Sequence, residues 1–137
     1  MIDDRFAIKF FSDEDYSEIV RWYMASDGQA PPIEYLPQES TFLVLAGNSL
    51  ILSVSLILSN SAFCYAEFFI GNPDADRKLR QDGSIFLADF IRNFAHESGY
   101  QRIACFAPNA RLRDYYQKLG FSPTLPDLTG MTMKLED

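Results

Sequence analysis

The most informative stretch of the chain is residues 109–121, which read Asn-Ala-Arg-Leu-Arg-Asp-Tyr-Tyr-Gln-Lys-Leu-Gly-Phe. Its apolar residues recur at helical spacing and share one face: Leu112, Tyr115, Tyr116 and Leu119. Asn109 is suited to cap the start of this helix, and Gly120 stands where a helix commonly ends in a left-handed residue. Periodicity alone therefore predicts a short helix that packs on the core through this face.

Composition limits what kind of protein this is. A chain of 137 residues with 47% hydrophobic content predicts one globular domain over residues 1–137. The net charge of −7 argues against sequence-independent binding to nucleic acid or to an anionic membrane surface. We expect no membrane span, because no apolar run reaches about 18 residues. Cys64 and Cys105 lack metal-ligand spacing, so they predict reduced core residues of a cytoplasmic protein without a bound metal.

The rest of the chain predicts alternating strands and helices. A strand over 6–11 precedes a helix that Ser12 caps, and Asp27-Gly28 ends that helix. The later expected elements are strands at 41–46, 49–58, 62–70 and 102–107, a helix from about 84 to 98, and a closing strand pair at 121–125 and 131–135. This order predicts an α/β (α+β) fold in which helices flank a mixed central sheet.

The element order and residues 109–121 together resemble the GNAT family of acyl-CoA-dependent N-acetyltransferases. In that family the last helix carries Asn, then Tyr seven residues on, then Gly-Phe at eleven and twelve. Asn109, Tyr116, Gly120 and Phe121 match this spacing without a gap. The resemblance extends from residue 6 to residue 135, and it implies acetyl-CoA as cosubstrate and an amine as acceptor.

A second family motif concerns the phosphate groups of the coenzyme. The family pattern is Arg or Gln, two residues, Gly, one residue, then Gly or Ala. Arg80 and Gly83 match it, and with Ser84 they are expected to bind the pyrophosphate at the start of the long helix. Ile85 departs from the pattern. The alternative is a plain helix N-terminus in which the basic residues of the loop only balance nearby aspartates.

The resemblance also implies residues that hold the coenzyme's arm. The family's pantetheine lies between two parallel strands that splay apart, and pairs with one strand backbone. The corresponding residues here are Phe68, Phe69 and Ile70, and Asn109 would contact the coenzyme from beyond the next strand. A backbone N–H of the splayed strand would polarise the thioester carbonyl.

Two side chains are the candidate proton carriers. Tyr116 would protonate the departing thiolate, because a phenol with a pKa of about 10 is protonated at neutral pH and matches a thiol of about 8.5. Glu67 interrupts an apolar strand and would deprotonate the acceptor ammonium, directly or through water. The alternatives are an aromatic packing residue at position 116 and a solvent-facing carboxylate at position 67. His96, near a helix end, predicts a surface role.

Two functions of different classes remain open from the sequence. The first is an acetyl-CoA-dependent N-acetyltransferase. The second is an inactive module with the same fold that serves binding or structure, which the branched Ile85 and the long polar segment 73–83 favour. The sequence carries no signal for the acceptor amine or the oligomeric state.

Overall fold

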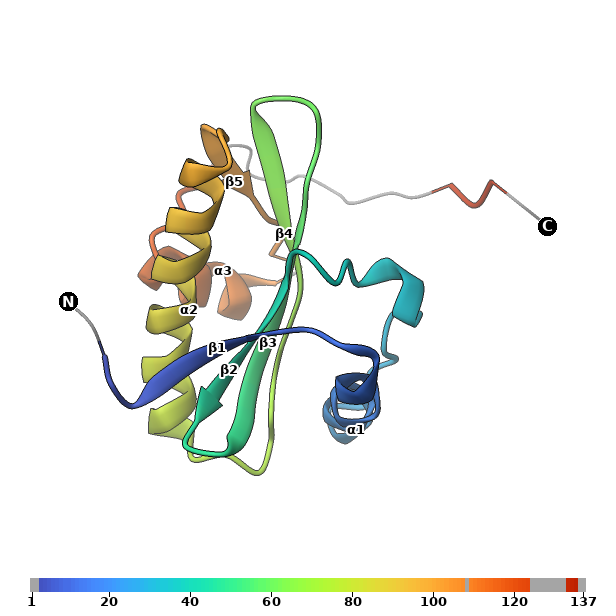
Figure 1. Ribbon diagram of the computed structural model, residues 1–137, viewed down its shortest axis with the longest axis vertical. Coiled ribbons are helices and arrows are strands. Elements are labelled where there is room, and N and C mark those ends of the chain that lie inside the picture. Colours follow the sequence, from blue (N-terminus) through green and yellow to red (C-terminus); the bar gives the residue numbers. More distant parts are fainter. Residues whose placement is uncertain (1–2, 108, 124–132, 136–137) are drawn as a thin grey trace. The chain divides into compact units, whose positions relative to one another are not determined.

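The computed structural model describes residues 3–107, 109–123 and 133–135. The chain forms two compact units, Met1–Cys105 and Phe106–Asp137, and each is described by itself. The first unit holds the sheet. Its strands are β1 (Phe6–Phe10), β2 (Thr41–Ala46), β3 (Ser49–Ile57), β4 (Phe63–Gly71) and β5 (Arg102–Ala104), and they lie side by side in that order (Figure 1).

The pairing in this sheet is mixed. The first four strands pair antiparallel with their neighbours, whereas β4 and β5 run parallel. The β2–β3 hairpin turns at Gly47, whose φ of +63° lies in the left-handed region that glycine adopts freely. Both the mixed sheet and this turn confirm the sequence predictions.

Helices cover both faces of the sheet. On one face lies α2 (Arg77–Glu97), and on the other lie α1 (Tyr16–Ala25) and the single-turn 3₁₀ helix η2 (Ile33–Tyr35) (Figure 1). A further 3₁₀ turn, η1 (Asp13–Asp15), precedes α1. None of the described helices has the length and apolarity that crossing a membrane requires.

The two faces have separate hydrophobic cores. The α2 face buries Phe42, Val54 and Leu56 of the sheet against Leu87 and Ile91. The α1 face is smaller and is built around Trp22, which is fully buried together with Ile19 and Leu43. Met24 of the same helix faces away from this core and is 69% exposed.

The second unit contains α3 (Ala110–Lys118). Four side chains of the helix and its C-cap are partly buried, and they are the four that the sequence predicted: Leu112, Tyr115, Tyr116 and Leu119. The expected closing strand pair has no strand at residues 121–123 or 133–135, and its remaining positions lie outside the described residues. The prediction of a single domain over 1–137 stays a prediction.

Candidate active site

An irregularity in β4 marks the candidate site. Between the pairs Ser53↔Ile70 and Ser55↔Glu67, β3 contributes one residue, whereas β4 contributes Phe68 and Phe69. This is a β-bulge, and Phe68 has a φ of +58°. Such a conformation is unusual for a bulky side chain and costs about 1–3 kcal/mol. Strained backbone of this kind clusters at functional sites, so the bulge points to the middle of β4.

The bulge lies beyond the point where β4 and β5 stop pairing. Their parallel ladder runs from Phe63↔Arg102 to Tyr65↔Ala104, and β4 then continues to Gly71. Among the described residues, β5 ends at Ala104, three residues short of the predicted end at 107. The structure therefore confirms parallel neighbours whose pairing ends part-way along β4.

Glu67 stands just before the bulge, on the face that α1 covers. Its neighbours Cys64 and Ala66 pack in the core on the α2 face, so alternation along the strand points Glu67 to the opposite face. Partial burial raises the pKa of the Glu67 carboxyl above its usual value. The same carboxylate, together with burial as the larger cause, raises the pKa of Cys105 to about 11. Glu67 and Cys105 are therefore within electrostatic reach of each other where β5 ends.

The expected phosphate loop has a different structure from the one predicted. The sequence placed the start of the long helix at about Ser84, but α2 begins at Arg77, with Asp76 as its N-cap. The Asp76 carboxylate accepts a hydrogen bond from the backbone N–H of Leu79 at 3.1 Å. The connection between β4 and α2 is consequently only residues 72–76, so the prediction of a long loop over 73–83 is wrong.

Gly83 and Ser84 lie inside α2, against the sheet. Both are buried, and a Cβ on Gly83 would come within 2.9 Å of Ile51 Cδ1. The Ser84 hydroxyl donates to the carbonyl of Arg80 at 2.8 Å. Because backbone N–H groups this far into a helix already bond to carbonyls one turn back, the predicted free N–H groups at these positions are absent. Ile85 points away from the core and is 55% exposed.

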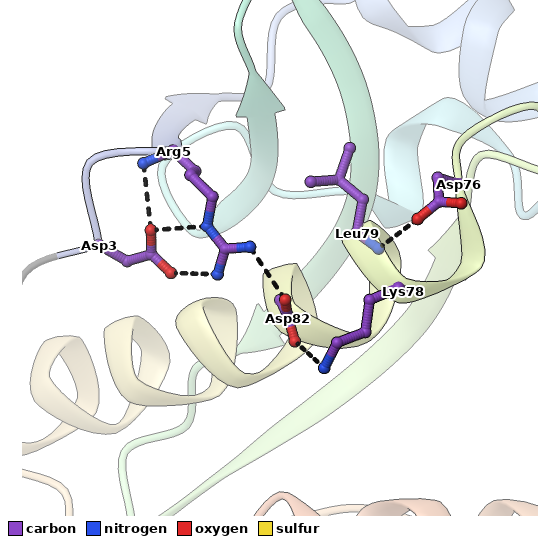
Figure 2. A network of polar contacts seen from close by, with 6 residues as sticks. All are labelled: Asp3, Arg5, Asp76, Lys78, Leu79 and Asp82. Atoms are coloured by element: carbon purple, nitrogen blue, oxygen red, sulfur yellow. Dashed lines mark hydrogen bonds and ion pairs between the residues drawn. The ribbon is translucent and has the colours of Figure 1, made fainter.

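Lys78 and Arg80, two basic residues of this segment, have different surroundings. Figure 2 shows that Lys78 pairs with Asp82 at 2.9 Å and that Asp82 also accepts a hydrogen bond from Arg5 at 3.0 Å. These two hydrogen bonds, the one from Lys78 first, hold the pKa of Asp82 below its usual value. Lys78 therefore balances an aspartate, as the alternative interpretation expected.

Arg80 behaves differently. Its side chain crosses the end of β4, where a Cβ on Gly71 would lie 3.4 Å from Arg80 Cδ. The Arg80 Nε is buried, and it has no hydrogen-bond partner among the described residues. A buried guanidinium nitrogen without an acceptor is costly, so this position favours an anion. Arg80 therefore lies beside Gly71, at the end of the strand that carries the bulge.

The remaining two predicted site residues belong to the second unit. Asn109 caps α3, and its side-chain oxygen accepts from the N–H of Leu112 at 2.9 Å. The helix ends in a Schellman motif, in which the N–H of Phe121 bonds to the carbonyl of Tyr116 at 3.1 Å and Gly120 has a φ of +107°. The rings of Tyr116 and Phe121 lie 6.0 Å apart, which supplies the apolar contact of that motif. Helix capping therefore accounts for the whole Asn-Tyr-Gly-Phe spacing.

Sequence reasoning missed two residues near Glu67. Ser55 is its direct cross-strand partner and is fully buried, and Cys105 was assigned to the core only. Strand register brings Ser55 to Glu67, and Cys105 follows the last residue of β5, which pairs with Tyr65. No local sequence signal specifies register between segments so far apart in the chain. The alternation of β3, in which serines interrupt an aliphatic run, was the one available sign.

Comparison with known proteins gives likeness in structure only. No protein-family model and no curated protein sequence matches the chain. An aminoglycoside acetyltransferase from an uncultured soil metagenomic sample matches with a TM-score of 0.65 and 16% identity, covering 98% of this chain and 100% of that one. A GNAT-family acetyltransferase from Streptococcus pneumoniae matches with a TM-score of 0.64 and 20% identity, covering 96% and 98%.

A third similar structure was determined with bound ligands. N-acetylglutamate synthase from Neisseria gonorrhoeae, complexed with coenzyme A and N-acetyl-glutamate, matches with a TM-score of 0.70 and 17% identity. The match covers 89% of this chain and 30% of that one. At such identities the likeness defines the fold. The chain has the fold of the GNAT acetyltransferases, and the resemblance predicted from the sequence is confirmed at that level.

Proposed function

We propose that this protein is an acetyl-CoA-dependent N-acetyltransferase that acetylates a primary amine. The observation that carries the proposal is the β4 bulge at Phe68, which follows the point where pairing with β5 ends. It supports a site in which an extended ligand pairs with β4 beyond Tyr65. The fold, which the chain shares with acetyltransferases, supports the same reaction class.

The residues present fit the coenzyme at two places and not at a third. Arg80, with its unpartnered Nε, suits a phosphate oxygen, and the β4 backbone at Phe68, Phe69 and Ile70 suits the pantetheine arm. Gly83 does not fit as a phosphate cradle in this conformation, because its missing side chain makes room for Ile51. Acetyl-CoA would supply the acyl group as an activated thioester.

Three groups of this chain carry out the proposed chemistry. The Glu67 carboxylate takes a proton from the acceptor ammonium, a role that its raised pKa favours. A backbone N–H of β4 polarises the acyl carbonyl. The Tyr116 hydroxyl donates its proton to the departing sulfur, and Asn109 of the same unit contacts the coenzyme. Tyr116 serves this role in addition to its packing on Phe121.

The alternative function is a binding or structural module without activity. The specific observation in its favour is the early start of α2 at Arg77. Gly83 and Ser84 are consequently buried inside the helix and do not form its N-terminus. The two functions predict different coenzyme binding. Isothermal titration with acetyl-CoA is expected to show binding that Arg80→Gln weakens and that Arg92→Gln, an exposed control on the same helix, leaves unchanged. Absence of binding at millimolar acetyl-CoA rejects the enzyme and leaves the module.

A further inference from the structure

A row of polar side chains crosses the α1 face of the sheet and ends at Glu67. Thr41, Ser55 and Glu67 are successive register partners on β2, β3 and β4. The hydroxyls of Thr41 and Ser55 are fully buried and lie 2.7 Å apart in a hydrogen bond. They satisfy each other, and no hydrogen bond links this pair to Glu67 among the described residues. Glu67 is therefore the open end of the row.

Within the described part of the first unit, no cation pairs with Glu67. Lys9 binds Asp15, Arg21 binds Glu18 and Asp74, and Arg5 binds Asp3 and Asp82. A half-buried carboxylate without a counter-charge has lost part of its hydration, and no ion pair replaces the lost interactions with water. The residue that faces it across the strands, Ser55, is neutral, and Cys105 nearby keeps its proton at neutral pH. The missing partner of Glu67 is thus a positive charge.

We propose that the acceptor is a cationic amine with no carboxylate or phosphate beside its amino group, bound as an ammonium ion against Glu67. This inference rests on the proposed function and narrows its substrate class. An ammonium ion restores the lost interactions of the carboxylate, and contact with Glu67 also presents the proton that must leave. An acceptor whose own carboxylate lies two bonds from its nitrogen would bring a like charge to Glu67.

Similar structures include proteins of both kinds. One is named for aminoglycosides, and another was determined with N-acetyl-glutamate, which carries carboxylates. The fold therefore does not decide the charge of the acceptor. In this chain the charge of the acceptor depends on the groups beside Glu67. The two that the structure describes in the first unit, Ser55 across the strands and Cys105, are not cations.

The test uses amines and amino acids that differ only by a carboxylate. The pairs are tyramine with tyrosine and 3-methylbutylamine with leucine, each assayed with the full-length protein and acetyl-CoA by thiol release. We expect kcat/KM to be about tenfold or more higher for the amine in at least one pair, as repulsion between like charges predicts. Equilibrium titration of the same compounds without coenzyme is expected to show the same preference.

Two variants separate charge from shape. Glu67→Gln keeps the side-chain size and removes the charge, so the binding preference for the amine is expected to fall to within about twofold of parity. Glu97→Gln, at the exposed end of α2, is the matched control and is expected to leave the preference intact.

The other possible outcomes reject either the charge assigned to the acceptor or the proposed acetyltransferase function. Turnover in which the amino acids match or exceed the amines overturns the charge assignment and leaves the acetyltransferase standing. An amine preference that survives Glu67→Gln also overturns it, because another group then sets the selectivity. Coenzyme binding without turnover of either amine rejects the inference as well. Absence of both coenzyme binding and turnover rejects the proposed function and, with it, this inference.

Discussion

At the scale of single residues, Glu67 has a consequence for stability that does not depend on catalysis. Its folded-state pKa lies above the ordinary value of 4.5 because burial disfavours the charged form. A raised folded pKa means that the favourable contribution exists below the unfolded pKa and is lost as pH rises through the folded pKa. The ionised Glu67 side chain therefore destabilises the folded state at neutral pH.

Glu67→Gln removes this destabilising charge. We expect the melting temperature of Glu67→Gln, relative to the parent protein, to increase between pH 4 and pH 7, with most of the change just above pH 4.5. The measurement is a pH series of thermal unfolding for both proteins, with Glu97→Gln as control. A difference that stays constant with pH would show that Glu67 is fully hydrated, which also removes the basis for its role as a base.

The proposed catalytic role of Tyr116 depends on its side-chain hydroxyl. Tyr116→Phe keeps the ring and its contact with Phe121 while removing the hydroxyl. If that hydroxyl protonates the thiolate, kcat should fall roughly 10²-fold or more with coenzyme affinity little changed. Stability should change by no more than about 1.5 kcal/mol, the value of one ordinary hydrogen bond.

The adjacent tyrosine provides the control for this experiment. Tyr115 lies on the same partly buried face, with its ring 6.2 Å from that of Tyr116. Tyr115→Phe should leave the rate nearly intact. Equal rates for the two variants would leave Tyr116 as a capping and packing residue, and would favour the module without activity.

At the scale of elements, the sequence predicted which helices and strands exist, and their order, better than it predicted the residues at which they begin and end. The hairpin β2–β3 was predicted closely because Gly47-Asn48 is a strong turn signal between apolar strands. The start of α2 was misplaced by about two turns. Residues 77–82 read as a polar loop, yet Arg, Lys and Gln are good helix formers and Asp76 is a good cap. Polarity here reflects the solvent-facing side of the first helical turns.

The bulge in β4 could not have been predicted from local sequence. A Phe in the left-handed region contradicts its backbone preference, so tertiary packing must impose it. The ring of Phe68 joins the core on the α1 face, while Phe69 packs on the α2 face. Burial of two adjacent phenylalanines on opposite faces, with one extra residue in the strand, is a property of the folded sheet.

Gly83 tests where α2 begins. Inside the helix, a Val at this position would press on Ile51 and Leu52, whose side-chain carbons lie 2.9 and 3.2 Å from an added Cβ. We expect Gly83→Val to lower the free energy of unfolding by roughly 1–3 kcal/mol through overpacking. Gln81→Val, exposed on the same helix, should cost only a few tenths of a kcal/mol.

The measurement for Gly83 is the midpoint of urea unfolding with an unchanged slope. Gly83→Ala should be close to neutral, because a gain of about 1 kcal/mol in helix propensity offsets the milder crowding. If Gly83→Val were as stable as Gln81→Val, Gly83 would lie outside the packed helix, as the sequence alone predicted.

At the scale of the whole molecule, the cores and the proposed chemistry are distributed unevenly along the chain. The buried residues of both hydrophobic cores lie between Phe6 and Ala95, and no residue of α3 is buried. The candidate acid Tyr116 and the cap Asn109 belong to the second unit. Composition predicted one domain over residues 1–137, and composition carries no information about how contacts are distributed along the chain.

This distribution predicts that a chain ending at Cys105 keeps its fold and loses its activity. Trp22, the only tryptophan, is fully buried in the α1-face core and reports on that fold directly. We expect the shortened chain to unfold cooperatively in urea with blue-shifted tryptophan emission in its native state, because its buried apolar contacts are retained. Acetyl transfer should fall to background, since Tyr116 is removed. The full-length Tyr116→Phe protein is the control, with the same loss of acid and an intact chain. Red-shifted emission without a cooperative transition would instead establish residues 1–137 as one inseparable domain, because the core of residues 6–95 would then depend on the remainder of the chain.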